Sequence, residues 1–160
     1  MSDIMTYDEA HYFQVGTGNS STIELGGVIT ELSENTNPVE NEKHYIHEKS
    51  ARTNVTGYSN EFPITMDMVS GDDVFNDMYS IFYNRKTGTE ALRDHYIVNL
   101  WEPVGSTENT YKARKINQTV SIEECTGDAG GQKQISGSLK GGNFVYGTFN
   151  TSSKTFTETV

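Results

Sequence analysis

Several features that define whole classes of protein are scarce or absent in this sequence. A single cysteine in 160 residues, Cys125, cannot form an internal disulfide, which favours a reducing compartment. No stretch approaches the roughly eighteen consecutive apolar residues of a membrane-spanning helix. The first residues, Met1 to Met5, lack the basic region and apolar run of a signal peptide. We therefore expect no association with a membrane.

Basic residues are also scarce. The chain has 12 Lys and Arg residues against 22 Asp and Glu residues, which gives a net charge of −10. Residues 1–42 contain acids but no Lys or Arg. Because binding of a phosphate backbone depends on cationic side chains, this composition disfavours a nucleic-acid-binding protein. Two interpretations stay open, namely charge that maintains solubility and a surface that must not adhere to nucleic acid.

The motifs of common catalytic sites are missing. There is no Gly-x-Ser-x-Gly elbow, no Walker loop and no Gly-x-Gly-x-x-Gly between a strand and a helix. Asp72 and Asp73 could act as paired carboxylates, but their position favours helix capping. Cys125 follows two glutamates, and acidic neighbours disfavour a reactive thiolate. We therefore expect no enzyme and no cofactor.

One short histidine pattern needs separate treatment. His44, His47 and Glu48 have the spacing of zinc ligands that share one helical face. The surrounding segment lacks helical periodicity, and no third ligand residue is evident. We therefore expect polar loop contacts here and no metal site, with a zinc enzyme as the weakest alternative.

The stretch from Asn60 to Gly88 carries the clearest structural pattern. Apolar residues alternate with polar ones from Phe62 to Met68, which predicts a half-buried strand. Pro63 has no N–H group, so this strand is expected to lie at a sheet edge or to begin near there. Ser70-Gly71-Asp72-Asp73 predicts a helix start, with a hydroxyl cap, and Gly88 predicts the stop. The expected core residues of this helix are Phe75, Met78, Ile81 and Phe82.

Short strands and turns are predicted for most of the remaining chain. They fall at residues 21–32 (interrupted by Gly26-Gly27), 94–101, 111–124, 133–139 and 144–149, the last three as a meander of hairpins. Residues 1–20 predict an extended N-terminal arm, and residues 150–160 a Ser/Thr-rich C-terminal tail. Residues 33–59 exceed a routine connection and predict a long projecting loop or β-hairpin.

Together these elements predict a single domain over residues 1–160. Its class is mainly β: a β-sandwich or open barrel of about six or seven strands, with one flanking α-helix and the long projecting loop or hairpin.

The order of these elements resembles that of the major tail (tail tube) proteins of long-tailed bacteriophages. The residues that carry the resemblance are Ser21–Leu32, the loop through Lys49–Ser59, the strand-to-helix unit Asn60–Asn84 and the late hairpin Gly141–Gly147. The resemblance covers most of the chain. It implies a β-sandwich or barrel of which six copies join their sheets into a ring, with rings stacked into a hollow tube that carries the genome.

The resemblance further implies a structural, self-assembling protein of the virion tail that is assembled in the host cytoplasm. Its implied partners are copies of itself and other tail proteins, such as a tape measure and a terminator. DNA would pass through an acidic-walled conduit without specific binding. A contractile-tail tube or a tail-completion ring are alternatives within the same resemblance.

Two groups of residues follow as candidates for this role. The long loop is expected to make ring-stacking contacts, through Asn37, Pro38, Glu42, Lys43, His44, Tyr45, His47, Lys49 and Arg52. Carboxylates on outward strand faces would repel DNA in a lumen. The candidates for these lumen acids are Glu61, Asp67 and Glu123.

A rival from another class is a β-sandwich module that binds carbohydrate or another ligand. Its candidate contacts are exposed aromatic side chains, namely Tyr45, Tyr58 and Trp101. Stoichiometry separates the two hypotheses, because a binding module saturates with ligand and does not polymerise.

Overall fold

Eleven strands and one α-helix dominate the residues that the structure, a computed structural model, describes, which are residues 2–159. The strands are β1 (Glu9–Val15), β2 (Thr22–Leu25), β3 (Ile29–Leu32), β4 (Pro38–Lys43), β5 (Arg52–Tyr58), β6 (Glu61–Asp67), β7 (Leu92–Pro103), β8 (Thr110–Thr126), β9 (Gln134–Lys140), β10 (Phe144–Asn150) and β11 (Thr155–Glu158). The helices are α1 (Asp73–Tyr83) and the 3-10 turns η1 (Thr6–Asp8), η2 (Gly18–Ser20) and η3 (Gly88–Ala91).

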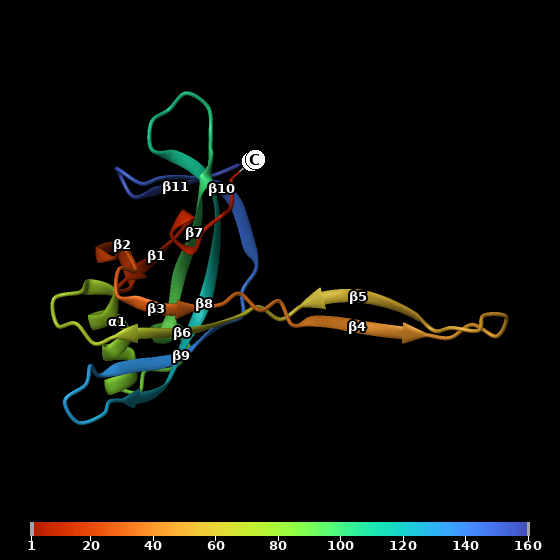
Figure 1. Cartoon of the computed structure of the whole chain (residues 1–160), viewed down its shortest axis with the longest axis horizontal. Helices are drawn as coiled ribbons and strands as arrows, with labels where there is room; N and C mark the ends of the chain where they lie inside the picture. Colours follow the sequence, from red (N-terminus) through yellow and green to blue (C-terminus); the bar gives the residue numbers. More distant parts are fainter. Residues whose placement is uncertain (1, 160) are drawn as a thin grey trace.

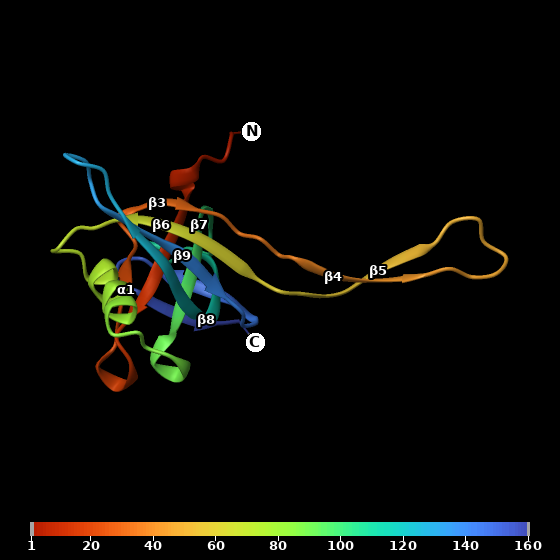
Figure 2. The same cartoon turned by 90° about the horizontal axis from the view of Figure 1, so that it is seen from below.

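Seven strands form a curled antiparallel sheet, in the order β2-β1-β7-β8-β9-β6-β3. Its two edge strands, β2 and β3, are consecutive in the chain and joined by a short turn at residues 26–28. The curl brings distant strands together: the rings of Phe62 on β6 and His95 on β7 lie 5.1 Å apart, although β8 and β9 separate their strands. The sheet is a half-barrel, and the predicted mainly β fold with an open barrel is confirmed (Figures 1 and 2).

The main hydrophobic core fills the inside of the half-barrel, and α1 packs against it. Phe62, Ile64 and Met66 of β6 are each at most 3% exposed, as the alternation predicted. They meet the buried helix residues Val74, Phe75, Met78 and Ile81. A second cluster lies on the opposite face of the sheet, where β10 and β11 fold over: Tyr12, Tyr96, Val98, Ala113 and Phe149.

The ends of α1 differ from the predicted ones. Asp72 caps the N-terminus, as its position favoured, in place of the predicted hydroxyl, because its carboxylate accepts a hydrogen bond from the Phe75 N–H at 2.9 Å. The helix ends at Tyr83, five residues before Gly88, and Arg85 then adopts a left-handed conformation with φ of 51°. The chain therefore leaves the helix without needing a glycine.

One predicted core residue of the helix is wrong. Phe82 is only half-buried, because it lies in the last turn, at the rim of the sheet, with the Arg85 guanidinium 4.7 Å from its ring centroid. A buried ion pair ties the helix to β7 instead. The guanidinium of Arg93, 3% exposed, donates to the Asp77 carboxylate at 2.8 Å.

Long β8 corrects the predicted meander. β9 pairs with residues 119–126 of this strand, and β10 pairs with residues 110–116, so the two lie end to end along one edge. Seventeen residues span roughly 55 Å at the rise of a strand, which leaves room for both partners. Gly142 allows the connection from β9 to β10 to pass close to β8, because a Cβ at this position would lie 2.1 Å from the Asn117 carbonyl oxygen.

Three further expectations from the sequence are corrected by the sheet. Residues 9–15 of the expected N-terminal arm form β1, which lies between β2 and β7. Strand β6 is not an edge strand, since it pairs with β3 and β9. Pro63 is tolerated because it faces Ser33, just beyond the last residue of β3, where no ladder donor is needed. The expected C-terminal tail contains β11, paired with β10.

Candidate functional site

The hairpin of β4 and β5 projects away from the half-barrel (Figures 1 and 2). Its strands form a separate sheet, paired from Pro38 with Tyr58 to Lys43 with Arg52. Every residue of β4 is exposed, and so is every residue of β5 except Gly57. The predicted projecting segment is thus a hairpin with both faces in water. Such a two-stranded sheet is marginally stable by itself, and nothing within residues 2–159 covers its two faces.

The root of the hairpin is held firmly. Asn35 and Glu61 exchange both backbone hydrogen bonds at 2.9 Å. The guanidinium of Arg114 on β8 donates two hydrogen bonds to the Glu34 carboxylate, each 2.9 Å. Burial opposes the charge of Arg114, but its bonds to Glu34 outweigh this and raise the pKa of the guanidinium. The direction of the hairpin is therefore set by the body.

The tip of the hairpin, residues 43–52, is an ordered turn. The guanidinium of Arg52 donates to the Glu48 carboxylate at 3.0 Å and lies 5.4 Å from the Tyr45 ring centroid. The His44 Nε2 donates to the Glu48 carbonyl at 2.7 Å. Ile46, in the same turn, is fully exposed. This exposed apolar side chain at the end of a long arm is available for contact with another molecule.

The candidate ring-stacking residues are distributed along this arm. Asn37 lies at the root, where its side-chain amide donates to the Ser59 carbonyl at 3.1 Å. Pro38, Glu42 and Lys43 lie on β4, and Arg52 begins β5. His44, Tyr45, His47 and Lys49 lie in the turn. Glu48 pairs with Arg52 and His47, and within residues 2–159 no group of three or more acids, His or Cys could hold a metal ion.

The three candidate lumen acids share one face of the sheet, the face opposite the main core. Glu61 and Asp67 alternate with the buried residues of β6. Glu61 accepts a hydrogen bond from the Ser138 hydroxyl at 3.2 Å, and Asp67 accepts one from the Gln134 amide at 2.9 Å. Glu123 lies at a bulge in β8 and lines a shallow hollow beside Thr65. Polar partners across the strands make up the rest of this polar face: Thr119, Ser121, Ser136 and Lys140.

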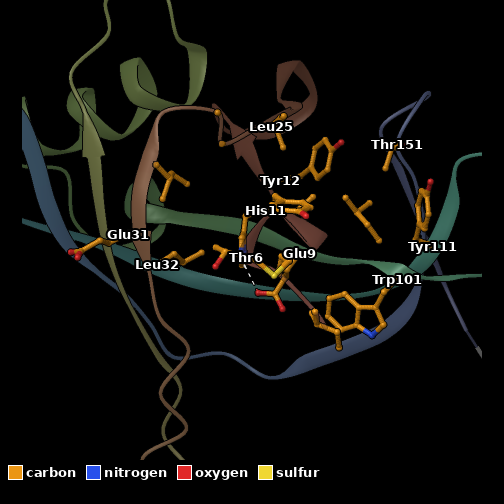
Figure 3. Close-up of a pocket in the computed structure, with 18 of the residues that line it drawn as sticks. Thr6, Glu9, His11, Tyr12, Leu25, Glu31, Leu32, Trp101, Tyr111 and Thr151 are labelled. Atoms are coloured by element: carbon orange, nitrogen blue, oxygen red, sulfur yellow. Dashed lines mark ion pairs between the residues drawn. The ribbon is translucent and has the colours of Figure 1, made fainter. Parts of the chain in front are cut away.

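A groove of about 810 Å³ lies where the two ends of the curled sheet approach one another (Figure 3). It is formed by residues 4–12, the β2–β3 turn, β3 and the end of β7. Apolar side chains line much of it, among them Ile4, Met5, Leu25, Leu32, Leu100 and Trp101. No sequence signal pointed to this groove, because its walls come from segments about a hundred residues apart.

A partly buried chain of polar side chains was also not predicted from the sequence. The Glu9 carboxylate lies 3.0 Å from Nε2 of His11, whose Nδ1 lies 2.9 Å from Nε2 of His95 (Figure 3 shows the first pair). The other nitrogen of His95 lies 3.1 Å from the Gln118 amide oxygen. Burial is the main cause that lowers the pKa of His95 well below its usual value. The hydrogen bond from His11 lowers the pKa of Glu9.

The aromatic residues of the rival hypothesis do not form one site. Tyr58 lies at the root end of the hairpin and Tyr45 in its tip, while Trp101 lines the groove on the body. A carbohydrate platform needs its rings side by side. The hairpin separates two of these rings from each other and from the third. Within residues 2–159, no helix is long and apolar enough to cross a bilayer.

Comparison with known proteins gives a single kind of result. No protein-family model and no curated protein matches the sequence. Among solved structures, the chain matches the SPP1 tail tube, solved as a hybrid of solid-state NMR and cryo-electron microscopy, with a TM-score of 0.60. The match covers 90% of this chain and 78% of that chain at 19% sequence identity. The chain therefore has the fold of a phage tail tube protein, and the resemblance read from the sequence is confirmed at the level of fold.

Proposed function

We propose that this chain is the subunit of a phage tail tube, a structural protein without catalytic function. Copies associate into hexameric rings, and the rings stack into a hollow tube that forms part of the virion tail. The observation that carries the proposal is a tail-tube fold that bears a hairpin bare on both faces. An arm of this kind becomes stable when a neighbouring subunit covers it.

The edges of the sheet support association within a ring. Strands β2 and β3 each pair on one side only within the described chain, so each leaves a row of backbone N–H and C=O groups for another strand. Monomeric proteins protect such edges. In a ring, pairing of these edges with the next subunit would extend the sheet.

The polar face supports the role of a conduit wall. Glu61, Asp67 and Glu123 stand on a surface of hydroxyl and carboxylate groups with few cations. Such a surface repels phosphate and gives DNA nothing to adhere to. We propose that this face lines the lumen, that DNA passes without specific binding, and that the ring-stacking contacts lie on the hairpin between Asn37 and Arg52.

Electron microscopy with sedimentation velocity tests the proposal. Purified protein at rising concentration should form six-fold rings or hollow tubes. A variant in which two glycines replace residues 38–58 should melt at the same temperature as the full chain but form no stacks. The proposal fails if the full chain neither forms rings or tubes by itself nor adds to tails that are growing in an extract of infected cells.

A further inference from the structure

The hairpin tip carries a net charge opposite in sign to that of the chain as a whole. Residues 43–52 contain three bases, Lys43, Lys49 and Arg52, and one acid, Glu48, a net charge of +2. The other residues hold nine bases and 21 acids, a net charge of −12. Within residues 2–159, Arg52 is paired with Glu48, whereas neither lysine of the tip forms an ion pair. The tip thus presents two unpaired cations beside the exposed Ile46 and the partly exposed Tyr45.

The groove has the complementary character. The charged residues that line it are Glu9 and Glu31, with no lysine or arginine among its described lining residues. Glu9 is engaged by His11, whereas Glu31 is exposed and forms no ion pair within residues 2–159. Around these acids, Leu25 is 47% exposed and Trp101 37% exposed. Exposed apolar side chains that gather in an acidic hollow mark an interaction surface.

The tip cannot reach the groove of its own chain. Eleven residues separate Thr36 at the root from His47 in the tip, a span of roughly 37 Å at the rise of a strand. The arm points away from the body along this length (Figures 1 and 2). A hairpin tip that occupies the groove must therefore come from another molecule.

We propose that the hairpin tip of one copy docks in the groove of a second copy, with Ile46 packed beside Leu25 and Lys49 facing Glu31. The match of charge favours a second copy as the occupant, because the tip carries a net charge of +2 and two lysines without an ion pair, whereas the groove is lined by Glu9 and Glu31. This inference rests on the proposed function and names the acceptor site for the arm. It also accounts for the exposed apolar residues at both ends of the contact.

Disulfide trapping tests the contact in assembled protein. Subunits that carry Cys125→Ala and Ile46→Cys are mixed with subunits that carry Cys125→Ala and Leu25→Cys, and the mixture is assembled and oxidised. A heterodimer should form in at least tenfold excess over that obtained when Val69→Cys replaces Leu25→Cys. Val69 is a matched control, because it is 40% exposed but does not line the groove.

Charge reversal and fluorescence give independent readouts. Glu31→Lys and Lys49→Glu should each weaken association at least fivefold, and the double variant should recover to within about twofold of the wild type. Trp101 is the sole tryptophan and lines the groove, so its emission reports occupancy. A disulfide-cyclised peptide of residues 43–52 should shift the emission of the dilute full chain, whereas the same peptide with Ile46→Asp should not.

The outcomes separate this inference from the proposed function. Tubes that form with neither the selective cross-link nor the charge-reversal rescue would overturn the docking site and leave the tail-tube function standing. Equal cross-linking of Leu25→Cys and Val69→Cys would also overturn it. If no tubes form but the peptide shifts Trp101 emission selectively, the acceptor site is supported while the tube is not.

Discussion

The half-barrel and the hairpin of one chain follow opposite rules of stability. In the half-barrel, the side chains that alternate inward are almost fully buried, and a second cluster covers part of the outer face. In the hairpin, all residues but Gly57 of both strands are exposed. The body has its own buried core, whereas the arm is held by backbone pairing and by exposed side-chain contacts such as the Arg52–Glu48 pair.

Under the proposed function, this difference divides the tasks of the subunit between its two regions. The body has its own core and accounts for most of the free energy of unfolding. The bonds between Arg114 and Glu34 fix the direction of the arm, although no other segment covers its strands within residues 2–159. Under the proposed function, the exposed surface of the arm is available for contact with the next copy. Substitutions in the two regions should therefore have separable effects, on stability in the body and on assembly in the arm.

The largest contrast is expected from deletions of apolar side chains. Phe62→Ala removes a ring that is 1% exposed, and it should lower the free energy of unfolding by about 3–5 kcal/mol. Val55→Ala in the arm should change it by less than about 0.5 kcal/mol, since Val55 is 51% exposed. Urea denaturation of dilute protein measures both, and a similar loss for Val55→Ala would show that the arm is part of the folding unit.

Ion pairs give the second contrast. Arg93→Met leaves the Asp77 carboxylate uncompensated near the core and should destabilise by about 3 kcal/mol. Arg52→Met breaks the pair with Glu48 in the tip, where the arginine is 64% exposed, and should cost less than about 1 kcal/mol. Thermal denaturation compares the two variants. Equal effects would contradict the assignment of stability to the body.

A third contrast concerns glycines. Gly142 has a φ of +82°, and a Cβ would clash with the Asn117 carbonyl, so Gly142→Ala should destabilise by roughly 1–3 kcal/mol or more. Gly57 in the arm has open space around it and an ordinary φ. Gly57→Ala should leave the unfolding midpoint unchanged within error. A destabilised Gly57→Ala variant would reveal contacts of the arm with the body.

The smallest effect depends on pH. The unfolded chain binds a proton on His95 near pH 6.5, whereas burial keeps the pKa of the folded residue well below that value. Stability is therefore full above about pH 6.5 and falls as the pH drops, by up to about 1.4 kcal/mol per unit. Glu9, with its lowered pKa, adds a loss at more acidic pH.

A matched pair of variants isolates the contribution of His95 to the pH dependence of stability. His95→Gln should be less stable at pH 8 but should show a flatter slope of unfolding free energy between pH 5 and 7. His47→Gln in the arm, where the ring stays in water, should retain the wild-type slope. An unchanged slope in His95→Gln would remove His95 as the titrating group.

The sequence predicts those parts of the molecule in which one face is buried and the pattern is local. The alternation of β6, the amphipathic α1 and the long polar insertion all belong to this kind. Strand β1 was missed because Phe13 faces the main core and Tyr12 the second cluster, so the alternation disappears. Its polar residues also read as solvent-exposed, although the Gln14 amide oxygen accepts a hydrogen bond from the Asp94 N–H at 3.0 Å.

Features that depend on distant pairing could not be predicted. Nothing local in β10 distinguishes β9 from β8 as its partner. The groove combines residues near Met5 with residues near Trp101, and their proximity follows only from the position of β1 beside β7. The candidate lumen acids were predicted by alternation alone, and their common face follows from the strand register.

Whether a second copy covers the hairpin is tested most directly by hydrogen exchange of the backbone amides of residues 38–58, measured in the dilute subunit and in assembled protein. We expect the hairpin amides to exchange fast in the dilute subunit and at least tenfold more slowly on assembly. The amides of β7 and β8 should be protected in both states. Equal protection of the hairpin in both states would contradict the claim that this arm waits for a second copy.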